Sequence, residues 1–290
     1  MLLVTGATGY VGGAALRLLS TLGGSRSVVG LARNAESAAV ATLKGTTYRI
    51  ADYNDRRSLD KAFEGATRLL FVASDGAGPD VIRQHANVID AATGSGIEHI
   101  VFTSIIDVAE TSPFYFAAVY RDAERRLIEC GKEWTILRCG LYSDFLLSNW
   151  LEPARSTGVI AVPAGQSRIT TLSRDDVAAA AAAVLASGAH RGQIHELTGP
   201  RTYAFEEIGE LASRVFGVPI AYKPCSPTDY LQRCRVTMGD PWPYVFATLF
   251  ASISQGRYAS ISSAVQDLSG NAPEGLEAFL ARNRHPVDEP

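Results

Sequence analysis

The sequence begins with LLVTGATGYVGG, residues 2–13, in which a short apolar run is followed at once by closely spaced glycines. The apolar run is typical of a buried strand, and residues 10–22 have the 3.6-residue apolar spacing of a helix. Between them, Gly6, Gly9 and Gly12 permit a tight turn, a close backbone approach to a pyrophosphate and close packing of helix on strand. We therefore expect a phosphate-binding loop in a strand–loop–helix unit, the alternative being a merely glycine-rich turn.

Farther along, apolar runs of strand length alternate with helical segments. Strands are expected at 2–5, 27–32, 47–50, 68–72, 97–103 and 134–137, and helices at 10–22, 35–43, 59–63, 79–93 and 115–130. Such alternation is typical of βαβ units, whose crossovers build a parallel sheet. The runs VVGLA, RLLFV and HIVFT are continuously apolar, as strands covered on both faces are. The fold class is therefore expected to be α/β, a Rossmann-type doubly wound parallel sheet.

Beyond about residue 140 the alternation loosens. Helices are expected at 175–186 and 205–216, strands at 193–197 and 219–223, and mostly helical structure over 228–282, with breaks near 239–243 and 270–273. This pattern predicts a smaller, helix-rich C-terminal lobe over the carboxyl edge of the sheet. We place the nucleotide-binding domain at residues 1–150 and the substrate lobe at 151–290, partly interleaved with the first.

The composition narrows the class of protein. The chain has 290 residues, 47% apolar and 20% charged, with a net charge of −3, which is ordinary for a soluble globular protein and argues against a nucleic-acid partner. No apolar run approaches the roughly 18 residues of a membrane span. The four cysteines show no C-x-x-C spacing, so neither disulfides nor a metal site is expected. Because the first strand starts at residue 2, no leader peptide is expected, and we predict a cytoplasmic protein.

The end of the second expected strand indicates which coenzyme the loop binds. A carboxylate for a ribose 2′-hydroxyl is missing there, and Arg33 stands 21 positions after Gly12 instead. A guanidinium can bind a 2′-phosphate through two hydrogen bonds, whereas a carboxylate would repel it. Arg33 therefore favours NADP(H) over NAD(H). The alternative is an ordinary surface arginine at a strand end.

Other strand ends supply further candidates, because ligands of such sheets lie at the carboxyl ends of the strands. Asp52 and Tyr53 follow the third strand, where the carboxylate accepts from an adenine amino group or, equally well, caps a helix. Ala73 and Ser74 end the fourth strand and are expected beside the coenzyme. Ser104 ends the fifth strand, and it either hydrogen-bonds a substrate oxygen or caps the following turn.

Together these segments resemble a known family. The stretches TGATGYVGG, VVGLARN, ADYND, RQHANVIDAA, HIVFTS, WTILRCGLYSDFL and SRDDVAAAAAAVL are similar to those of the NmrA-like atypical short-chain dehydrogenase/reductases. Within that group the chain most resembles the type 2 NADPH quinone reductases and the triphenylmethane reductases. The likeness runs from residue 1 to about 225 and is weak in the last 60 residues.

The resemblance implies an NADP(H)-binding Rossmann domain with a small C-terminal substrate lobe. By it, the glycine loop holds the pyrophosphate, Arg33 the 2′-phosphate and Ala73-Ser74 the ribose, while residues 138–143 approach the nicotinamide. The full set of residues expected to bind the coenzyme is Gly6, Ala7, Thr8, Gly9, Tyr10, Val11, Gly12, Arg33, Asp52, Tyr53, Ala73, Ser74, Arg138 and Gly140.

One feature departs from most short-chain reductases, which use a Tyr-x-x-x-Lys pair for proton transfer. No tyrosine here has lysine four residues on: Tyr115 is followed at that distance by Val119, and Phe116 by Tyr120. Tyr120 is therefore our candidate proton donor together with Ser104, the alternative for Tyr120 being helix packing.

Aromatic side chains are the candidates for contact with an acceptor. Tyr142 and Phe145 are expected to stack on it, the alternative being packing within the lobe. Trp150, Trp242 and Tyr244 could line the same pocket, but the sequence does not place them in space. His85 and His99 are expected to be structural.

Two functions fit these features. The first is an NADPH-dependent oxidoreductase that transfers hydride to a quinone-like or other electron-poor aromatic acceptor, chemistry that needs proximity more than acid–base catalysis. The second is a non-catalytic NADP(H)-binding redox sensor. An epimerase is disfavoured, because it needs the missing tyrosine–lysine pair. The sequence leaves the oligomeric state open, with a homodimer among the options.

Overall fold

The computed structural model describes residues 1–21, 27–40 and 46–284. Within these residues seven parallel strands form the main sheet, in the order β10-β6-β5-β4-β1-β2-β3. Their bounds are β1 Leu2–Val4, β2 Val28–Ala32, β3 Thr47–Ile50, β4 Arg68–Phe71, β5 His99–Ile105, β6 Glu133–Cys139 and β10 Gln193–Leu197. The chain starts in the middle and winds outward both ways, so the order reverses between β1 and β4. Ligands of such sheets bind at this reversal.

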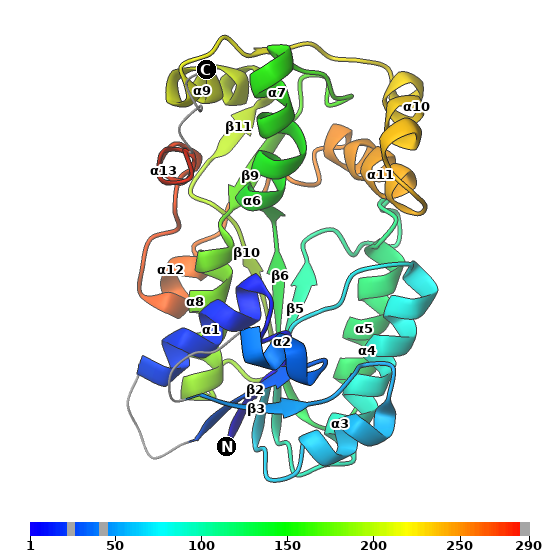
Figure 1. Cartoon of the computed structure of the whole chain (residues 1–290), viewed down its shortest axis with the longest axis vertical. Helices are drawn as coiled ribbons and strands as arrows, with labels where there is room; N and C mark the ends of the chain where they lie inside the picture. Colours follow the sequence, from blue (N-terminus) through cyan, green and yellow to red (C-terminus); the bar gives the residue numbers. More distant parts are fainter. Residues whose placement is uncertain (22–26, 41–45, 285–290) are drawn as a thin grey trace.

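Helices cover both faces of the sheet (Figure 1). One face carries α1 (Tyr10–Thr21), α8 (Arg174–Ser187) and α12 (Ala264–Ser269), and the other carries α3 (Arg56–Ala62), α4 (Gly78–Thr93) and α5 (Ala117–Glu129). The alanine-rich helix α8 is buried along most of its length, and its small side chains let it pack closely on α1 and the sheet. The short helix α2 (Ala35–Val40) follows β2.

A smaller lobe lies over the carboxyl ends of the strands (Figure 1). Its strands are β7 Leu141–Tyr142, β9 Arg168–Leu172 and β11 Thr202–Ala204 in one small sheet, with β8 Val159–Ile160 and β12 Ala221–Tyr222 as a separate pair. Its helices are α6 Ser143–Leu146, the π-helical turn η1 Leu147–Leu151, α7 Glu152–Thr157, α9 Phe205–Phe216, α10 Pro227–Thr237, α11 Trp242–Ser254 and α13 Leu276–Arg282. Buried aromatic residues, Trp150, Phe205 and Phe250 among them, form the core of this lobe.

The predicted fold class is confirmed, and the differences are local. Helix α3 begins at Arg56 because the Asp55 carboxylate accepts from the N–H groups of Arg57 and Ser58, a cap that apolar spacing alone does not reveal. The small sheet β7-β9-β11 was not predicted; β7 and β11 have only two and three residues, too few for an apolar pattern. Residues 255–263 are not helical. The predicted helices 10–22 and 35–43 end in residues that lie outside the described ranges.

The division at residue 150 stays a prediction. Strand β10 and helix α8 both come from beyond that residue, yet they belong to the main sheet and to one of its covering layers. None of the helices in the described ranges has the length and apolarity that crossing a bilayer requires.

Candidate active site

The glycine loop between β1 and α1 is folded too tightly for side chains at two positions. Gly6 has a positive φ of 59°, and its carbonyl oxygen accepts from the Gly9 N–H at 2.9 Å. A Cβ atom on Gly12 would lie 2.3 Å from the Gly6 oxygen and 2.7 Å from the Thr5 oxygen. This geometry brings backbone to the surface at the start of α1, which suits a phosphate group.

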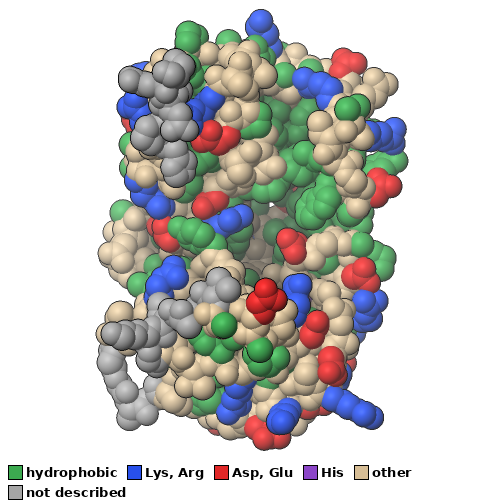
Figure 2. Space-filling view, viewed as in Figure 1, with side chains coloured by type: hydrophobic (Ala, Val, Ile, Leu, Met, Phe, Trp, Pro, Cys, Tyr) green, Lys and Arg blue, Asp and Glu red, His purple; other side chains and the backbone are tan. Residues whose placement is uncertain are grey.

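A cavity of about 730 Å³ opens between the carboxyl ends of the strands and the lobe. Figure 2 shows the molecule hollowed at this waist, with hydrophobic side chains gathered on the lobe side. The cavity is lined by most of the residues predicted from the sequence: Gly6, Thr8, Gly9, Tyr10, Val11, Gly12, Arg33, Asp52, Tyr53, Ala73, Ser74, Ser104, Tyr120, Gly140, Tyr142 and Phe145.

Two predicted residues are placed elsewhere. Ala7 is buried beneath the loop, where its methyl group packs against the backbone of β2 at Gly30. Arg138 does not line the cavity; its guanidinium donates to both carboxylate oxygens of Glu124, at 3.0 and 2.6 Å. The expectation that Arg138 faces the coenzyme is therefore corrected: its place on β6 turns it toward α5, where it neutralises a buried carboxylate.

At the far end of the glycine loop, Arg33 lies exposed at the exit of β2. No carboxylate of the described chain pairs with it, so its five N–H donors are available to an anion. Asn34 and Ser37 line the same corner, and the Asn34 side-chain oxygen accepts from the Ser37 N–H at 2.8 Å. The sequence reasoning missed both, although asparagine before a short helix is a recognisable capping signal.

Asp52 and Tyr53 form the neighbouring wall. The Asp52 carboxylate accepts from the Asn54 backbone N–H at 2.8 Å and from the Asn54 side chain at 3.0 Å. These contacts form a local turn, not the helix cap that was the alternative to an adenine contact. The Tyr53 hydroxyl donates to the Val72 carbonyl at 2.9 Å, and burial raises the pKa of this tyrosine. Tyr53 thus fixes the exit of β4 and presents its ring to the cavity.

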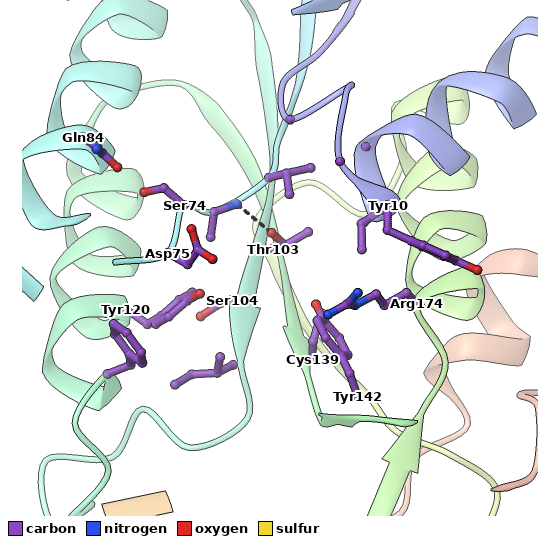
Figure 3. Close-up of a pocket in the computed structure, with 18 of the residues that line it drawn as sticks. Tyr10, Ser74, Asp75, Gln84, Thr103, Ser104, Tyr120, Cys139, Tyr142 and Arg174 are labelled. Carbon is purple, nitrogen blue, oxygen red and sulfur yellow. Dashed lines mark hydrogen bonds between the residues drawn. The ribbon is translucent and has the colours of Figure 1, made fainter. Parts of the chain in front are cut away.

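The exit of β4 is held by two further hydrogen bonds. The Ala73 N–H donates to the Thr103 hydroxyl oxygen at 3.0 Å (Figure 3), and the Ser74 N–H donates to Nε2 of His85 at 3.2 Å. Burial lowers the pKa of His85 to about 4, so the ring is neutral, as an acceptor at Nε2 must be. The prediction that His85 is structural agrees with this contact, although no local sequence pattern indicates Ser74 as its partner.

The side chain of Ser74 indicates that a ribose fits at the exit of β4. Its hydroxyl oxygen is buried and has no hydrogen-bond partner among the described residues, yet Ser74 lines the cavity. A buried hydroxyl without a partner costs free energy that a ligand hydroxyl would recover. The loop, Arg33 and Ser74 therefore fit the pyrophosphate, 2′-phosphate and ribose of NADP(H).

Ser104 belongs to a buried charged network at the exit of β5. Its hydroxyl donates to Oε1 of Glu124 at 2.6 Å, and Glu124, on α5, is held by Arg138. The alternative of a turn cap is not seen, because no described residue donates an N–H to the Ser104 hydroxyl oxygen. What Ser104 offers to the cavity is an oxygen lone pair.

Tyr120, one helical turn before Glu124, points into the cavity beside Ser104 (Figure 3). Its ring packs against His85, Phe102 and Phe116, with centroids 5.8 to 6.3 Å apart. Burial raises the pKa of its phenol, so Tyr120 keeps its proton at neutral pH. Where other reductases carry lysine four residues after their tyrosine, this helix carries a glutamate.

Aromatic side chains from distant segments line the other end of the cavity. Tyr142 and Phe145 were predicted; the sequence reasoning missed Phe114, Phe116 and Tyr258, and the lobe adds Trp242, Val245 and Leu249. Of the three further aromatic candidates only Trp242 faces the cavity. Trp150 packs behind Phe145, with ring centroids 5.4 Å apart, and Tyr244 is exposed. No local pattern could have gathered these rings, because tertiary packing does so.

Comparison with known proteins agrees with this geometry. A family model described as NAD(P)H-binding matches residues 6–188. Quinone oxidoreductase 2 of Escherichia coli is 33% identical over 230 residues, 79% of each chain. The crystal structure of the NADPH-dependent quinone oxidoreductase from that organism, complexed with NADPH, superposes with a TM-score of 0.91 at 29% identity, covering 98% of this chain and 99% of the other.

A second solved structure gives the same result. The triphenylmethane reductase of Citrobacter sp., complexed with NADP(H), has a TM-score of 0.89 at 29% identity, again covering 98% of this chain and 99% of the other. The family resemblance predicted from the sequence is thereby confirmed. By its sequence, its sheet order and its glycine loop, the chain belongs to the NAD(P)H-binding family of oxidoreductases that includes these quinone and dye reductases.

Proposed function

We propose that the chain transfers hydride from NADPH to a quinone-like or other electron-poor aromatic acceptor. The observation that carries this proposal is one continuous cavity, lined at one end by the glycine loop and Arg33 and at the other by aromatic rings. A site that holds both reactants face to face provides the proximity on which hydride transfer depends.

The coenzyme end assigns a role to each of its groups. The amides of the glycine loop would hold the pyrophosphate, Arg33 the 2′-phosphate and Ser74 a ribose hydroxyl, with the Gly140 backbone near the nicotinamide. NADPH, when bound, supplies the hydride from C4 of its nicotinamide ring. The chain's own part is to fix that ring at the exits of β4, β5 and β6.

The acceptor end suits a flat, apolar molecule. Phe114, Phe116 and Trp242 come from the loop after β5 and from α11, and they line the cavity together with Tyr142 and Phe145. The Phe116 and Trp242 rings have centroids 6.4 Å apart. Rings at these positions exclude water and favour stacking with a planar acceptor. Cys139 also lines the cavity, but burial raises the pKa of its thiol to about 12, so it is no nucleophile at neutral pH.

Proton supply narrows the class of acceptor. The Ser104 proton is donated to Glu124, and the Tyr120 phenol has no neighbouring lysine to lower its pKa. The site is therefore a weak general acid. Quinones and cationic dyes are strong electrophiles whose reduced forms need no strong acid, and a quinol oxygen can take its proton from water or from Tyr120. Reduction of a simple ketone needs a stronger general acid than this site offers.

The relatives support the same class. The proteins named above reduce quinones or triphenylmethane dyes with NADPH according to their names. Both kinds of acceptor are planar or propeller-shaped aromatic molecules with an electron-poor carbon or oxygen. The acceptor end of this cavity has the lining that such molecules require.

The test is oxidation of NADPH by the purified chain with a panel of benzoquinones and naphthoquinones, followed by loss of NADPH absorbance. We expect turnover above buffer with at least the more electrophilic members, and less with simple ketones. Absence of turnover with every quinone, alongside intact NADPH binding, would contradict the reductase and favour the redox sensor.

A further inference from the structure

Arg174 lines the cavity but belongs to neither the glycine loop nor the aromatic end. It is the first residue of α8 and lines the cavity beside Tyr10 and Tyr142 (Figure 3). Its guanidinium carbon is 5.9 Å from the Tyr10 ring centroid and 5.6 Å from that of Tyr142. Tyr10 belongs to the glycine loop itself, so Arg174 lies close to the point where α1 begins.

The guanidinium of Arg174 makes no hydrogen bond or ion pair with any described residue. The carboxylates around it are engaged elsewhere. Asp175 accepts from the Tyr10 hydroxyl at 3.2 Å and pairs with Arg282 at 2.8 Å. Asp144 accepts from the backbone N–H of Arg174 at 3.2 Å, not from its side chain. The result is a half-buried cation held by two rings with its N–H donors free.

The carboxylates nearest the start of α8 have hydrogen-bond partners other than Arg174. Asp176 accepts from the Ser173 hydroxyl at 2.8 Å and from the Glu274 backbone N–H at 3.0 Å. The Arg282–Asp175–Tyr10 contact also fixes the ring over which the guanidinium lies. An arginine oriented in this way loses little entropy on binding an anion.

The charges of the cavity indicate which anion this is. Among the lining residues the charged ones are Arg33, Arg174, Asp52 and Asp75. Arg33 lies at the β2 exit, where a 2′-phosphate is expected, and Asp52 lies beside it. Arg174 lies beside Tyr10, the first residue of α1, where the pyrophosphate is expected. The loop offers only neutral amides to that doubly charged group.

We propose that Arg174 binds the coenzyme pyrophosphate from the side opposite the glycine loop. The inference rests on the proposed coenzyme binding and adds a second cation to it, one that comes from the C-terminal half of the chain. A guanidinium can donate two N–H groups to one phosphoryl unit, which makes the contact specific as well as attractive. Because Arg174 follows strand β9 of the small sheet, the coenzyme would join the two halves of the molecule.

The experiment compares two coenzymes, because NADH and NADPH share the pyrophosphate and differ in the 2′-phosphate. Titration calorimetry of Arg174→Met should show weaker binding of both NADPH and NADH, each by about 10- to 100-fold. Arg33→Met should weaken NADPH alone. Arg174→Lys keeps the charge without the planar donors, and we expect an intermediate loss.

Arg201→Met is the matched control, since Arg201 also lies over a tyrosine ring, at 3.8 Å from the Tyr203 centroid, but outside the cavity. It should leave both dissociation constants unchanged. Thermal unfolding by circular dichroism, with a melting temperature of Arg174→Met near that of the wild type, shows that the loss is not one of folding.

Three results would overturn the inference. Unchanged binding of both coenzymes, with a raised KM for a sulfonated naphthoquinone, would assign Arg174 to an anionic acceptor. Weaker binding of NADPH alone would assign it to the 2′-phosphate. An equal loss of coenzyme affinity in Arg174→Met and Arg201→Met would mean that the net charge of the protein, and no specific contact, sets the affinity. If the wild type binds neither coenzyme, the proposed function itself fails, and the inference fails with it.

Discussion

The two ends of the cavity are built in different ways. At the coenzyme end, a short run of consecutive residues presents backbone amides, and its geometry is fixed by what glycine lacks. At the acceptor end, side chains from the loop after β5, from β7 and from α11 meet only because the lobe packs over the sheet. The first end is specified locally and the second by tertiary packing. The coenzyme end should therefore tolerate substitutions less well.

The largest effect is expected at Gly12. In Gly12→Ala the new Cβ would lie 2.3 Å from a carbonyl oxygen, so loop and helix must separate. We expect coenzyme binding to be lost and the free energy of unfolding to fall by about 3 kcal/mol. Calorimetry and urea unfolding measure the two. Gly239→Ala is the control, because a Cβ there meets nothing within 4 Å; equal behaviour of the two variants would refute the local specification of the loop.

The second prediction concerns His85, whose Nε2 accepts from the Ser74 N–H at the exit of β4. This contact should make the free energy of unfolding depend on pH. Burial lowers the pKa of His85 from 6.5 to about 4, so the unfolded chain binds its proton first as the pH falls. The stabilising contribution is complete above pH 6.5 and is lost toward pH 4, by about 3 kcal/mol. Urea unfolding of His85→Gln, whose amide oxygen can accept from Ser74, should therefore depend less on pH. Parallel curves for variant and wild type would contradict a neutral buried His85.

Reversal of charge at Arg33 tests whether this residue recognises the 2′-phosphate. Arg33→Glu is expected to weaken NADPH binding by about 100-fold, because a carboxylate then faces the 2′-phosphate. NADH binding should change little, since its ribose has no phosphate. Calorimetric dissociation constants for both coenzymes give the ratio. An unchanged ratio would mean that Arg33 is only a surface residue.

The smallest effect is expected at the acceptor end. Trp242→Ala removes one of several rings, so the KM for a naphthoquinone should rise by about tenfold with the dissociation constant of NADPH unchanged. Tyr244→Ala is the control on the same helix, because that exposed ring points away from the cavity. A loss of coenzyme affinity in Trp242→Ala would show that the aromatic end also contributes to coenzyme binding.

The contrast between local sequence features and tertiary packing also explains which parts of the site could be predicted from the sequence. The glycine spacing, the apolar strands and Arg33 are local features, and from them the sheet, the loop and most of the cavity lining at the coenzyme end could be predicted. Arg138 was misplaced because its partner, Glu124, lies on another element, and a sequence does not show which face of a strand a partner covers. Phe114, Tyr258 and Arg174 were missed for the same reason. The homodimer and the cytoplasmic location stay predictions.

The proposed hydride transfer requires that one cavity holds coenzyme and acceptor together. A crystal structure of the ternary complex with NADP⁺ and a naphthoquinone would show whether it does. We expect the quinone ring to lie flat against the nicotinamide, bordered by Trp242 and Phe145, with the pyrophosphate between the glycine loop and Arg174. A nicotinamide whose reactive face is covered by the protein's own side chains, leaving the quinone elsewhere or unbound, would contradict the account.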